Sequence, residues 1–88
     1  MVRINTQMIP VEDRQILGQL AALFRGRKAR RVNDHELTGM SGYTLRNING
    51  AIERGWCLDI DESWGVLYRL TPSGVRLVSL YVANGGDV

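Results

Sequence analysis

Residues 41–54 carry the side chains of this sequence that are best suited to directed hydrogen bonding with a partner. On a helical wheel the apolar residues of the segment share one side: Leu45, Ile48, Ala51 and Ile52. The other side holds Gly42, Tyr43, Arg46, Asn47, Gly50 and Arg54. A guanidinium can bond to the edge of a guanine, and a side-chain amide to that of an adenine. The segment is therefore predicted to be a helix whose polar face approaches a partner closely at Gly50.

A basic cluster lies between residues 25 and 31. Its members, five of the eleven basic residues of the chain, are Arg25, Arg27, Lys28, Arg30 and Arg31. The net charge of +2 is too small to indicate nucleic acid by itself, so the uneven distribution matters more than the sum. We expect the cluster to neutralise phosphates and to speed association with them. A solvated basic loop is the alternative.

The residue types that carry out catalysis or hold metals are few and scattered. His35 has no second ligand at a useful spacing and is expected to be exposed or to cap a helix, and Cys57 is the single cysteine of the chain, so no disulfide or metal site is predicted. No nucleophile stands with a base, so we expect neither an enzyme nor a cofactor. The chain has no signal peptide or apolar run long enough for a membrane span, and we expect a protein of the reducing cytoplasm.

The elements that must position these residues follow from caps and periodicity. Pro10 with two acids after it starts a helix, Asn33 and Glu36 have the spacing of a capping box, and Ser41 is a good N-cap. Alternating apolar and polar residues after Gly55 predict two strands joined by a tip, DESWG. One domain over 1–88 is thus predicted: an arm at 1–9, helices at 10–25, 34–39, 41–54 and 72–83, a short strand at Val32, and a hairpin at 56–70.

Two segments carry a resemblance to a known family. TGMSGYTLRNINGAIERGW resembles the turn and recognition helix of MarR-like and PadR-like regulators, and YRLTPSGVRLV resembles the end of their wing. With the element order, the resemblance covers about residues 10–82. It implies a mostly helical α+β fold, the winged helix-turn-helix, with a three-helix core, a two- or three-stranded wing hairpin and a C-terminal helix.

The resemblance also implies double-stranded DNA as the partner, with the helix at 41–54 in the major groove. It places base reading on Tyr43, Arg46 and Asn47. Contacts with the DNA backbone are expected from Ser41, Thr44, Arg54 and the basic cluster at 25–31. Gly50 would let the helix axis lie close to the duplex.

The hairpin tip departs from the pattern of DNA-binding wings, which usually offer Arg or Lys. Here Asp61 and Glu62 would repel phosphate, and Ser63 and Trp64 follow them. Either the wing points away from the duplex, or a protein partner meets it with Trp64 as an anchor. Trp64 folded back over the core is the alternative to that role.

The last helix is apolar around most of its circumference, which indicates that more than one side is covered. We expect a homodimer that pairs Leu77, Leu80 and Tyr81 of two copies and presents two recognition helices to a palindromic site. Similar winged-helix regulators commonly dimerise through terminal helices. A small-molecule effector is not expected, because the core is too small for a sizeable pocket.

Two functions remain open at this point. The first is sequence-specific DNA binding by a small transcription regulator of bacterial, plasmid or phage type, cytoplasmic and nucleoid-associated; an architectural protein would differ only in specificity. The alternative is a winged-helix protein-binding module, an inhibitor or adaptor that docks through the acidic wing or the basic face. The two functions differ in whether the basic cluster and the polar face of the helix at 41–54 form one surface.

Overall fold

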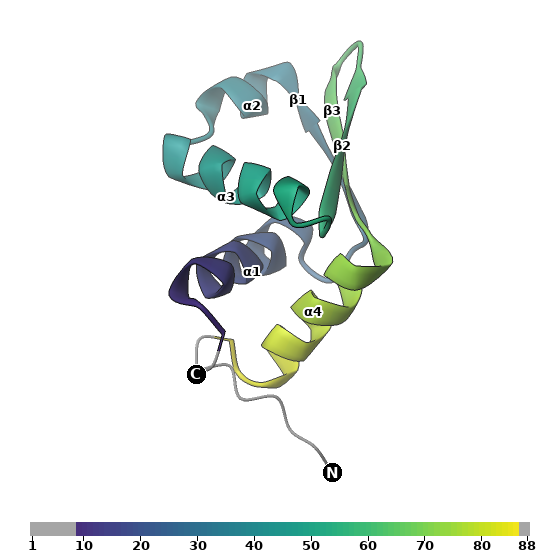
Figure 1. Ribbon diagram of the computed structural model, residues 1–88. Coiled ribbons are helices and arrows are strands. Elements are labelled where there is room, and N and C mark those ends of the chain that lie inside the picture. The colour runs from purple at the N-terminus through teal and green to yellow at the C-terminus, as the bar shows by residue number, and fades with distance from the viewer. Residues whose placement is uncertain (1–8, 87–88) are drawn as a thin grey trace.

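The computed structural model describes residues 9–86, which form four helices and three strands (Figure 1). In chain order they are α1 (Val11–Phe24), β1 (Ala29–Asn33), α2 (Asp34–Gly39), α3 (Gly42–Glu53), β2 (Cys57–Glu62), β3 (Gly65–Leu70) and α4 (Pro72–Ala83). The predicted α+β class with four helices is confirmed, and the strand expected at Val32 is the third strand of a sheet. The arm expected at 1–9 lies outside the described residues except for Ile9.

Helix α1 supplies more buried apolar residues to the core than any other described element. Its buried residues recur with helical spacing: Ile16, Leu17, Leu20, Leu23 and Phe24. Helices α3 and α4 both pack against it. From α3, Ile48 and Ala51 are fully buried in the same core. The two helices are thus held in place by one shared apolar element.

The sheet is antiparallel with strand order β1-β3-β2, so β3 lies in the centre. Val66, Tyr68 and Leu70 of β3 are buried and face the helices, which places Leu67 and Arg69 on the opposite, outer face. The predicted five-residue tip is shorter than expected, because Glu62 pairs with Gly65 and leaves Ser63 and Trp64 as the turn.

Strand β2 exposes the side that its composition suggests would be buried. Its alternating apolar residues Leu58 and Ile60 are 48% and 40% exposed, whereas Cys57 is fully buried. The register explains the difference, because Leu58 pairs with Arg69 and Ile60 pairs with Leu67, all on the outer face. Alternation predicted the two faces of the strand correctly but not which of them meets the helices.

The junction between β3 and α4 explains the LTPSG stretch. The Thr71 hydroxyl accepts the Gly74 amide at 3.1 Å, which caps α4, and donates to the Gly55 carbonyl at 2.6 Å. Gly74 is buried directly against the main chain of Trp56, and a Cβ there would overlap the Trp56 carbonyl oxygen. Thr71 and Gly74 therefore fasten α4 to the segment that leaves α3.

Among residues 9–86, none of the helices has the length and apolar character required to cross a membrane.

Candidate functional site

Helix α3 begins two residues after α2, and its first turn is capped as predicted. The Ser41 oxygen accepts the Thr44 amide at 3.1 Å, and the Ser41 hydroxyl donates to the Thr44 hydroxyl oxygen at 3.1 Å. Both hydroxyls were expected to bind phosphate, but the hydroxyl hydrogen of Ser41 is used within this cap. In these two bonds the Thr44 hydroxyl only accepts, so its hydrogen can still be donated to a partner.

The exposed side of α3 presents a stripe of polar side chains. Residues at spacings of four, three and four share this side and are all exposed: Gly42, Arg46, Asn49 and Glu53. Tyr43 stands beside them and is 52% exposed. We call these four residues together with Tyr43 the α3 stripe, and it contains two of the three predicted base-reading residues, Tyr43 and Arg46. Asn49, which the sequence analysis did not select, lies three residues after Arg46 and belongs to it as well.

The third predicted base-reading residue, Asn47, is not on the surface. It is 5% exposed, and its Nδ2 has no hydrogen-bond partner in the described part of the chain. Gly50 is likewise turned inward, since a Cβ at Gly50 would lie 2.8 Å from Cδ1 of Ile16 in α1. The predictions for Asn47 and Gly50 are wrong, because α3 is covered on two sides and its buried face extends past the apolar stripe. Gly50 serves the approach of α3 to α1.

Arg54 is committed to an intramolecular ion pair and not to a partner. Its guanidinium lies 2.9 Å from the carboxylate of Asp13 and 3.9 Å from that of Glu12. The same group lies 5.7 Å from the centroid of the Trp56 ring. Arg54 thus forms a clamp between the end of α3 and the start of α1, and is not the unengaged guanidinium that its predicted role in binding the DNA backbone assumes.

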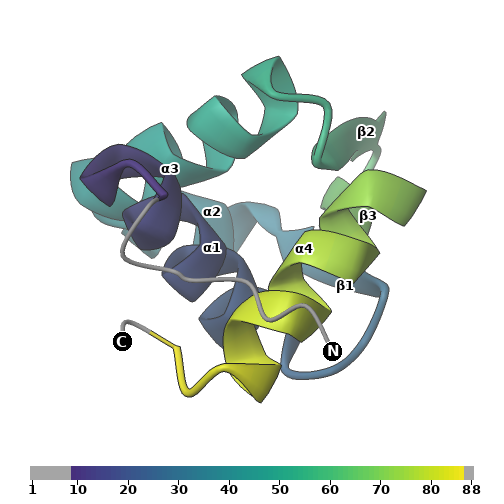
Figure 2. The same cartoon turned by 60° about the horizontal axis from the view of Figure 1, so that its bottom comes forward.

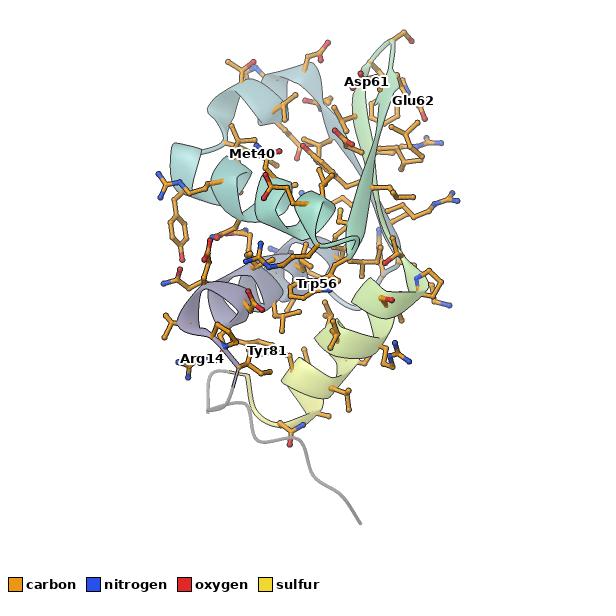
Figure 3. All side chains as sticks on the ribbon, in the orientation of Figure 1. Arg14, Met40, Trp56, Asp61, Glu62 and Tyr81 are labelled. Atoms are coloured by element: carbon orange, nitrogen blue, oxygen red, sulfur yellow. The ribbon has the colours of Figure 1, made fainter. Side chains whose placement is uncertain are left out.

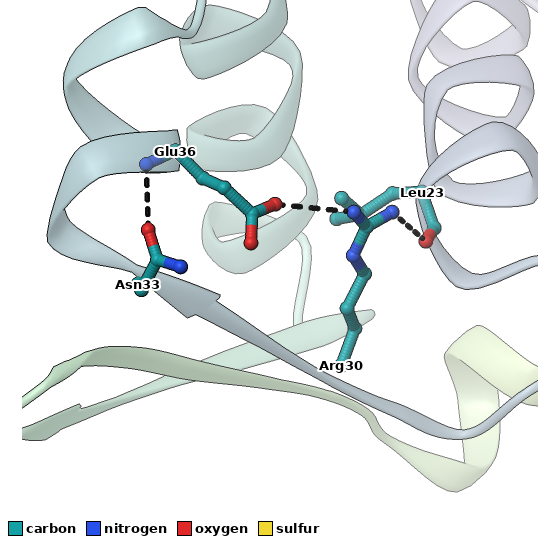
Figure 4. A network of polar contacts seen from close by, with 4 residues as sticks. All are labelled: Leu23, Arg30, Asn33 and Glu36. Carbon is teal, nitrogen blue, oxygen red and sulfur yellow. Dashed lines mark hydrogen bonds and ion pairs between the residues drawn. The ribbon is translucent and has the colours of Figure 1, made fainter.

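Arg30 of the basic cluster is also engaged inside the molecule (Figure 4). One guanidinium nitrogen donates to the Leu23 carbonyl at 3.0 Å, and another lies 3.2 Å from the Glu36 carboxylate. The Glu36 amide in turn donates to the Asn33 side chain at 2.8 Å, which is the predicted cap of α2. Arg30 thus joins α1, β1 and α2, so its guanidinium is already engaged within the molecule, while 38% of its side chain stays exposed.

Of the other cluster residues, Arg25, Arg27 and Lys28 lie in the loop between α1 and β1, and Arg31 lies in β1. Arg25 adopts a left-handed conformation (φ 49°) that ends α1, and the Lys28 carbonyl accepts the Leu70 amide at 2.8 Å, so the loop is tied to the end of β3. Arg25, Arg27, Lys28 and Arg31 are exposed. A hollow at this loop is lined by these arginines together with Leu67 and Arg69 of β3, without a carboxylate.

The loop and the α3 stripe do not form one surface. Figure 2 shows α3 on one side of the molecule and the loop between α1 and β1 on the other, with α1 between them. The groove between α1 and α3 is lined by residues of those two helices alone, and its charged residues are Glu12, Arg46, Glu53 and Arg54. The α3 side is therefore mixed in charge, whereas the loop side is strongly positive.

The hairpin tip is acidic and tied to the start of α2. Asp61 and Glu62 are exposed near the end of the hairpin (Figure 3), and Ser63 is exposed beside them. The Trp64 carbonyl accepts the Asp34 amide at 3.0 Å, and the Trp64 indole nitrogen donates to the Glu62 carboxylate at 2.9 Å. The ring of Trp64 lies 5.5 Å from the Arg31 guanidinium. Trp64 packs at the tip and is not a member of the core cluster.

Helix α4 carries more apolar surface than its own domain covers. Gly74 is its buried residue, while Leu77, Leu80 and Tyr81 are half-buried and Val82 is 58% exposed. On the inner side, Val75 and Val78 pack against the core. The three residues predicted for the dimer interface therefore keep accessible surface.

Residues 9–86 contain no group of three or more His, Cys, Asp or Glu side chains able to hold a metal ion. Comparisons of the chain with protein-family profiles, with curated proteins and with solved structures find no match.

Proposed function

We propose that this chain is a winged-helix protein that binds double-stranded DNA by inserting α3 into the major groove. The observation that carries the proposal is the α3 stripe, where the Tyr43 ring, the Arg46 guanidinium and the Asn49 amide stand exposed along the first eight residues of a helix that follows α2 after two residues. Arg46 and Asn49 are one turn apart and offer the paired hydrogen bonds that guanine and adenine accept in the major groove. Their side chains face away from the core.

The order of the elements supports the same proposal. A sheet of order β1-β3-β2 with α2 and α3 in sequence between β1 and β2 is the arrangement expected of a winged helix, with β2 and β3 as the wing. The acidic tip formed by Asp61 and Glu62 would lie away from the phosphates. We propose in addition that two copies pair through α4, which would bury the accessible parts of Leu77, Leu80 and Tyr81 and present two α3 helices to a palindromic site.

The charges predict how such binding depends on salt. Arg46 is the free-standing basic residue of the α3 stripe, since Arg54 is paired with Asp13. The affinity for DNA falls with salt in proportion to the phosphates that are neutralised. Because Arg46 is proposed to face the bases, binding through α3 is expected to show a shallow logarithmic salt slope, of magnitude no more than about 1 per protomer, whereas binding through the basic loop is expected to show a slope of about −4.

The experiment begins with selection of duplexes from a random-sequence library and continues with fluorescence anisotropy on the selected duplex at several salt concentrations. Arg46→Ala and Asn49→Ala should each weaken binding by about tenfold, as loss of a bidentate base contact does. The matched control, Arg27→Ala, removes an exposed Arg from the opposite side and should bind like the wild type. The proposal fails if no sequence is enriched, or if Arg27→Ala weakens binding while Arg46→Ala does not.

A second candidate function, a protein-binding module, is favoured by one observation: the basic loop and the α3 stripe lie on opposite sides of the molecule (Figure 2). A basic surface that does not adjoin the base-reading helix is not needed for that helix to bind DNA. The loop side is therefore available to a separate partner.

A further inference from the structure

The outer face of the sheet carries apolar side chains that no described element covers. Leu58 and Ile60 are 48% and 40% exposed, and Leu67 is half-buried beside Ile60. In Figure 1 helices α1, α2 and α3 all lie on the other side of the strands. Isolated apolar residues on a surface need no explanation, but adjacent ones in paired strands form a patch that a partner can desolvate.

Basic side chains frame this patch on one side. Arg31 pairs across the strands with Leu67, and Arg69 pairs with Leu58, so both arginines share the outer face with the apolar residues. The hollow at the basic loop continues the patch, because Leu67 and Arg69 line it together with Arg25 and Arg27. Glu62 ends β2 on the same face as Leu58 and Ile60, where its carboxylate accepts the Trp64 indole nitrogen at 2.9 Å. We call five residues of the sheet, Arg31, Leu58, Ile60, Leu67 and Arg69, the outer sheet face.

The mixture of side chains indicates the chemistry of the partner. A nucleic acid would use the arginines for its phosphates and aromatic rings for its bases. The Trp64 ring beside this face lies against Arg31 and is bonded to Glu62, and the centre of the face consists of the aliphatic side chains of Leu58 and Ile60, which a nucleic acid does not use. An acidic protein segment satisfies both parts, because its carboxylates pair with Arg31 and Arg69 and its aliphatic side chains cover the patch.

The edge of the sheet is protected against another mode of docking. Asp59 and Asp61 on β2, with Glu62 at its end, would repel an acidic strand that paired with this edge. The partner therefore lies across the face of the sheet and not alongside β2.

We propose that the outer sheet face and the adjoining loop hollow bind an acidic protein segment in which aliphatic residues alternate with carboxylates. This inference deepens the second candidate function and does not require α3 to bind DNA. Because charge alone would attract any anion, the aliphatic contacts are the part of the proposal that distinguishes a protein from a nucleic acid.

The test uses a fluorescein-labelled peptide in which leucines alternate with glutamates and aspartates, titrated with the full chain by fluorescence anisotropy. Two control peptides replace the acids with lysine or the leucines with serine. Arg69→Glu and Ile60→Ser should each weaken binding of the acidic peptide at least fivefold, about the effect of losing 1 kcal/mol of contact. Their matched controls on other faces, Arg46→Glu and Val82→Ser, should bind the peptide like the wild type.

Backbone amide shifts in a two-dimensional NMR spectrum locate the site in the same titration and are expected at Leu58, Ile60, Leu67 and Arg69. The proposal is overturned if the acidic peptide does not bind, if the serine peptide binds equally well, or if the control variants lose as much affinity as the test variants. A random duplex titrated in parallel separates the two surfaces: duplex binding that is lost in Arg69→Glu and kept in Arg46→Glu would assign the outer sheet face to nucleic acid. Loss in Arg46→Glu alone would leave this inference intact, whatever the specificity of α3.

Discussion

The guanidinium of Arg54, at the end of α3, lies 2.9 Å from the carboxylate of Asp13 in the first turn of α1. Its Nε donates to the same carboxylate oxygen at 3.0 Å, and its Nη1 donates to the Gly50 carbonyl at 3.1 Å. The side chains of Arg54 and Asp13 are 27% and 24% exposed, so solvent screens the pair only in part. This pair fixes the angle at which α3 lies on α1, and with it the direction of the α3 stripe.

Replacing Arg54 by alanine should lower the free energy of unfolding by about 1–2 kcal/mol, because Asp13 and the Gly50 carbonyl lose a charged hydrogen-bond donor. Arg54→Lys should recover part of this loss, since an ammonium cannot contact Asp13 and Gly50 with the same fork. Urea denaturation followed by circular dichroism measures both variants. Arg46→Ala, an exposed arginine of the same helix, is the control, and equal stability of Arg54→Ala and Arg46→Ala would refute the clamp.

Asn47 offers a test of burial against base reading. Its Nδ2 is buried without a hydrogen-bond partner among the described residues, and an unsatisfied buried donor costs about 1–3 kcal/mol. Asn47→Leu has nearly the same shape without that donor and should raise the free energy of unfolding by about 1 kcal/mol while DNA binding is unchanged. Chemical denaturation and anisotropy on one preparation give both values. If Asn47→Leu is stable but no longer binds DNA, Asn47 contacts the bases after all.

Gly74 should tolerate no side chain. A Cβ at this position overlaps the Trp56 carbonyl oxygen, which is itself held by the Thr71 amide at 3.0 Å, so the backbone must shift. Gly74→Ala is expected to lower the free energy of unfolding by more than about 2 kcal/mol, despite the better helix propensity of alanine. Gly39→Ala is the control, because a Cβ at Gly39 meets nothing within 4 Å. Similar stabilities of the two variants would show that the contact with Trp56 relaxes at little cost.

The parts of the fold that depend on neighbours in sequence were predictable. Asn33 and Ser41 each cap a helix with the side chain that the spacing indicated, Thr71 caps α4 in the same way, and each bond closes within three residues. Such interactions need no knowledge of the rest of the chain. They are sufficient to fix the start of α2, α3 and α4.

The parts that depend on distant residues were not predictable. Arg54 and Asp13 are separated by 41 positions. A helical wheel of residues 41–54 places Arg54 on the polar face but contains no information about a partner so far away in sequence. The same wheel placed Asn47 outside, because it assumed one buried stripe where α3 meets two neighbours. The exposure of Ile60 likewise depends on its pairing with Leu67, which the sequence of β2 does not contain.

The buried thiol of Cys57 should make stability depend on pH in the alkaline range. Burial is the main cause that raises the pKa of Cys57 from 9.0 to about 11, and the charge of Asp59 adds to it. A group whose pKa is higher in the folded state stabilises the fold below the unfolded value and loses this contribution as the pH rises through the folded value. The free energy of unfolding should therefore fall between pH 9 and pH 11, by about 1 kcal/mol halfway. Burial also raises the pKa of Tyr68, which acts in the same direction.

Urea denaturation at neutral pH and across this range measures the slope in the wild type and in Cys57→Ala. At neutral pH the variant should be less stable, because the buried sulfur is missing. Its stability should fall less steeply with pH, because of the two groups with a raised pKa, Cys57 and Tyr68, only Tyr68 remains. Alkylation by iodoacetamide gives an independent check: the folded protein should react far more slowly than the protein in urea, because the thiolate is both scarce and covered. Equal slopes in the two proteins, together with rapid alkylation of the folded chain, would show that Cys57 is not held neutral in the core.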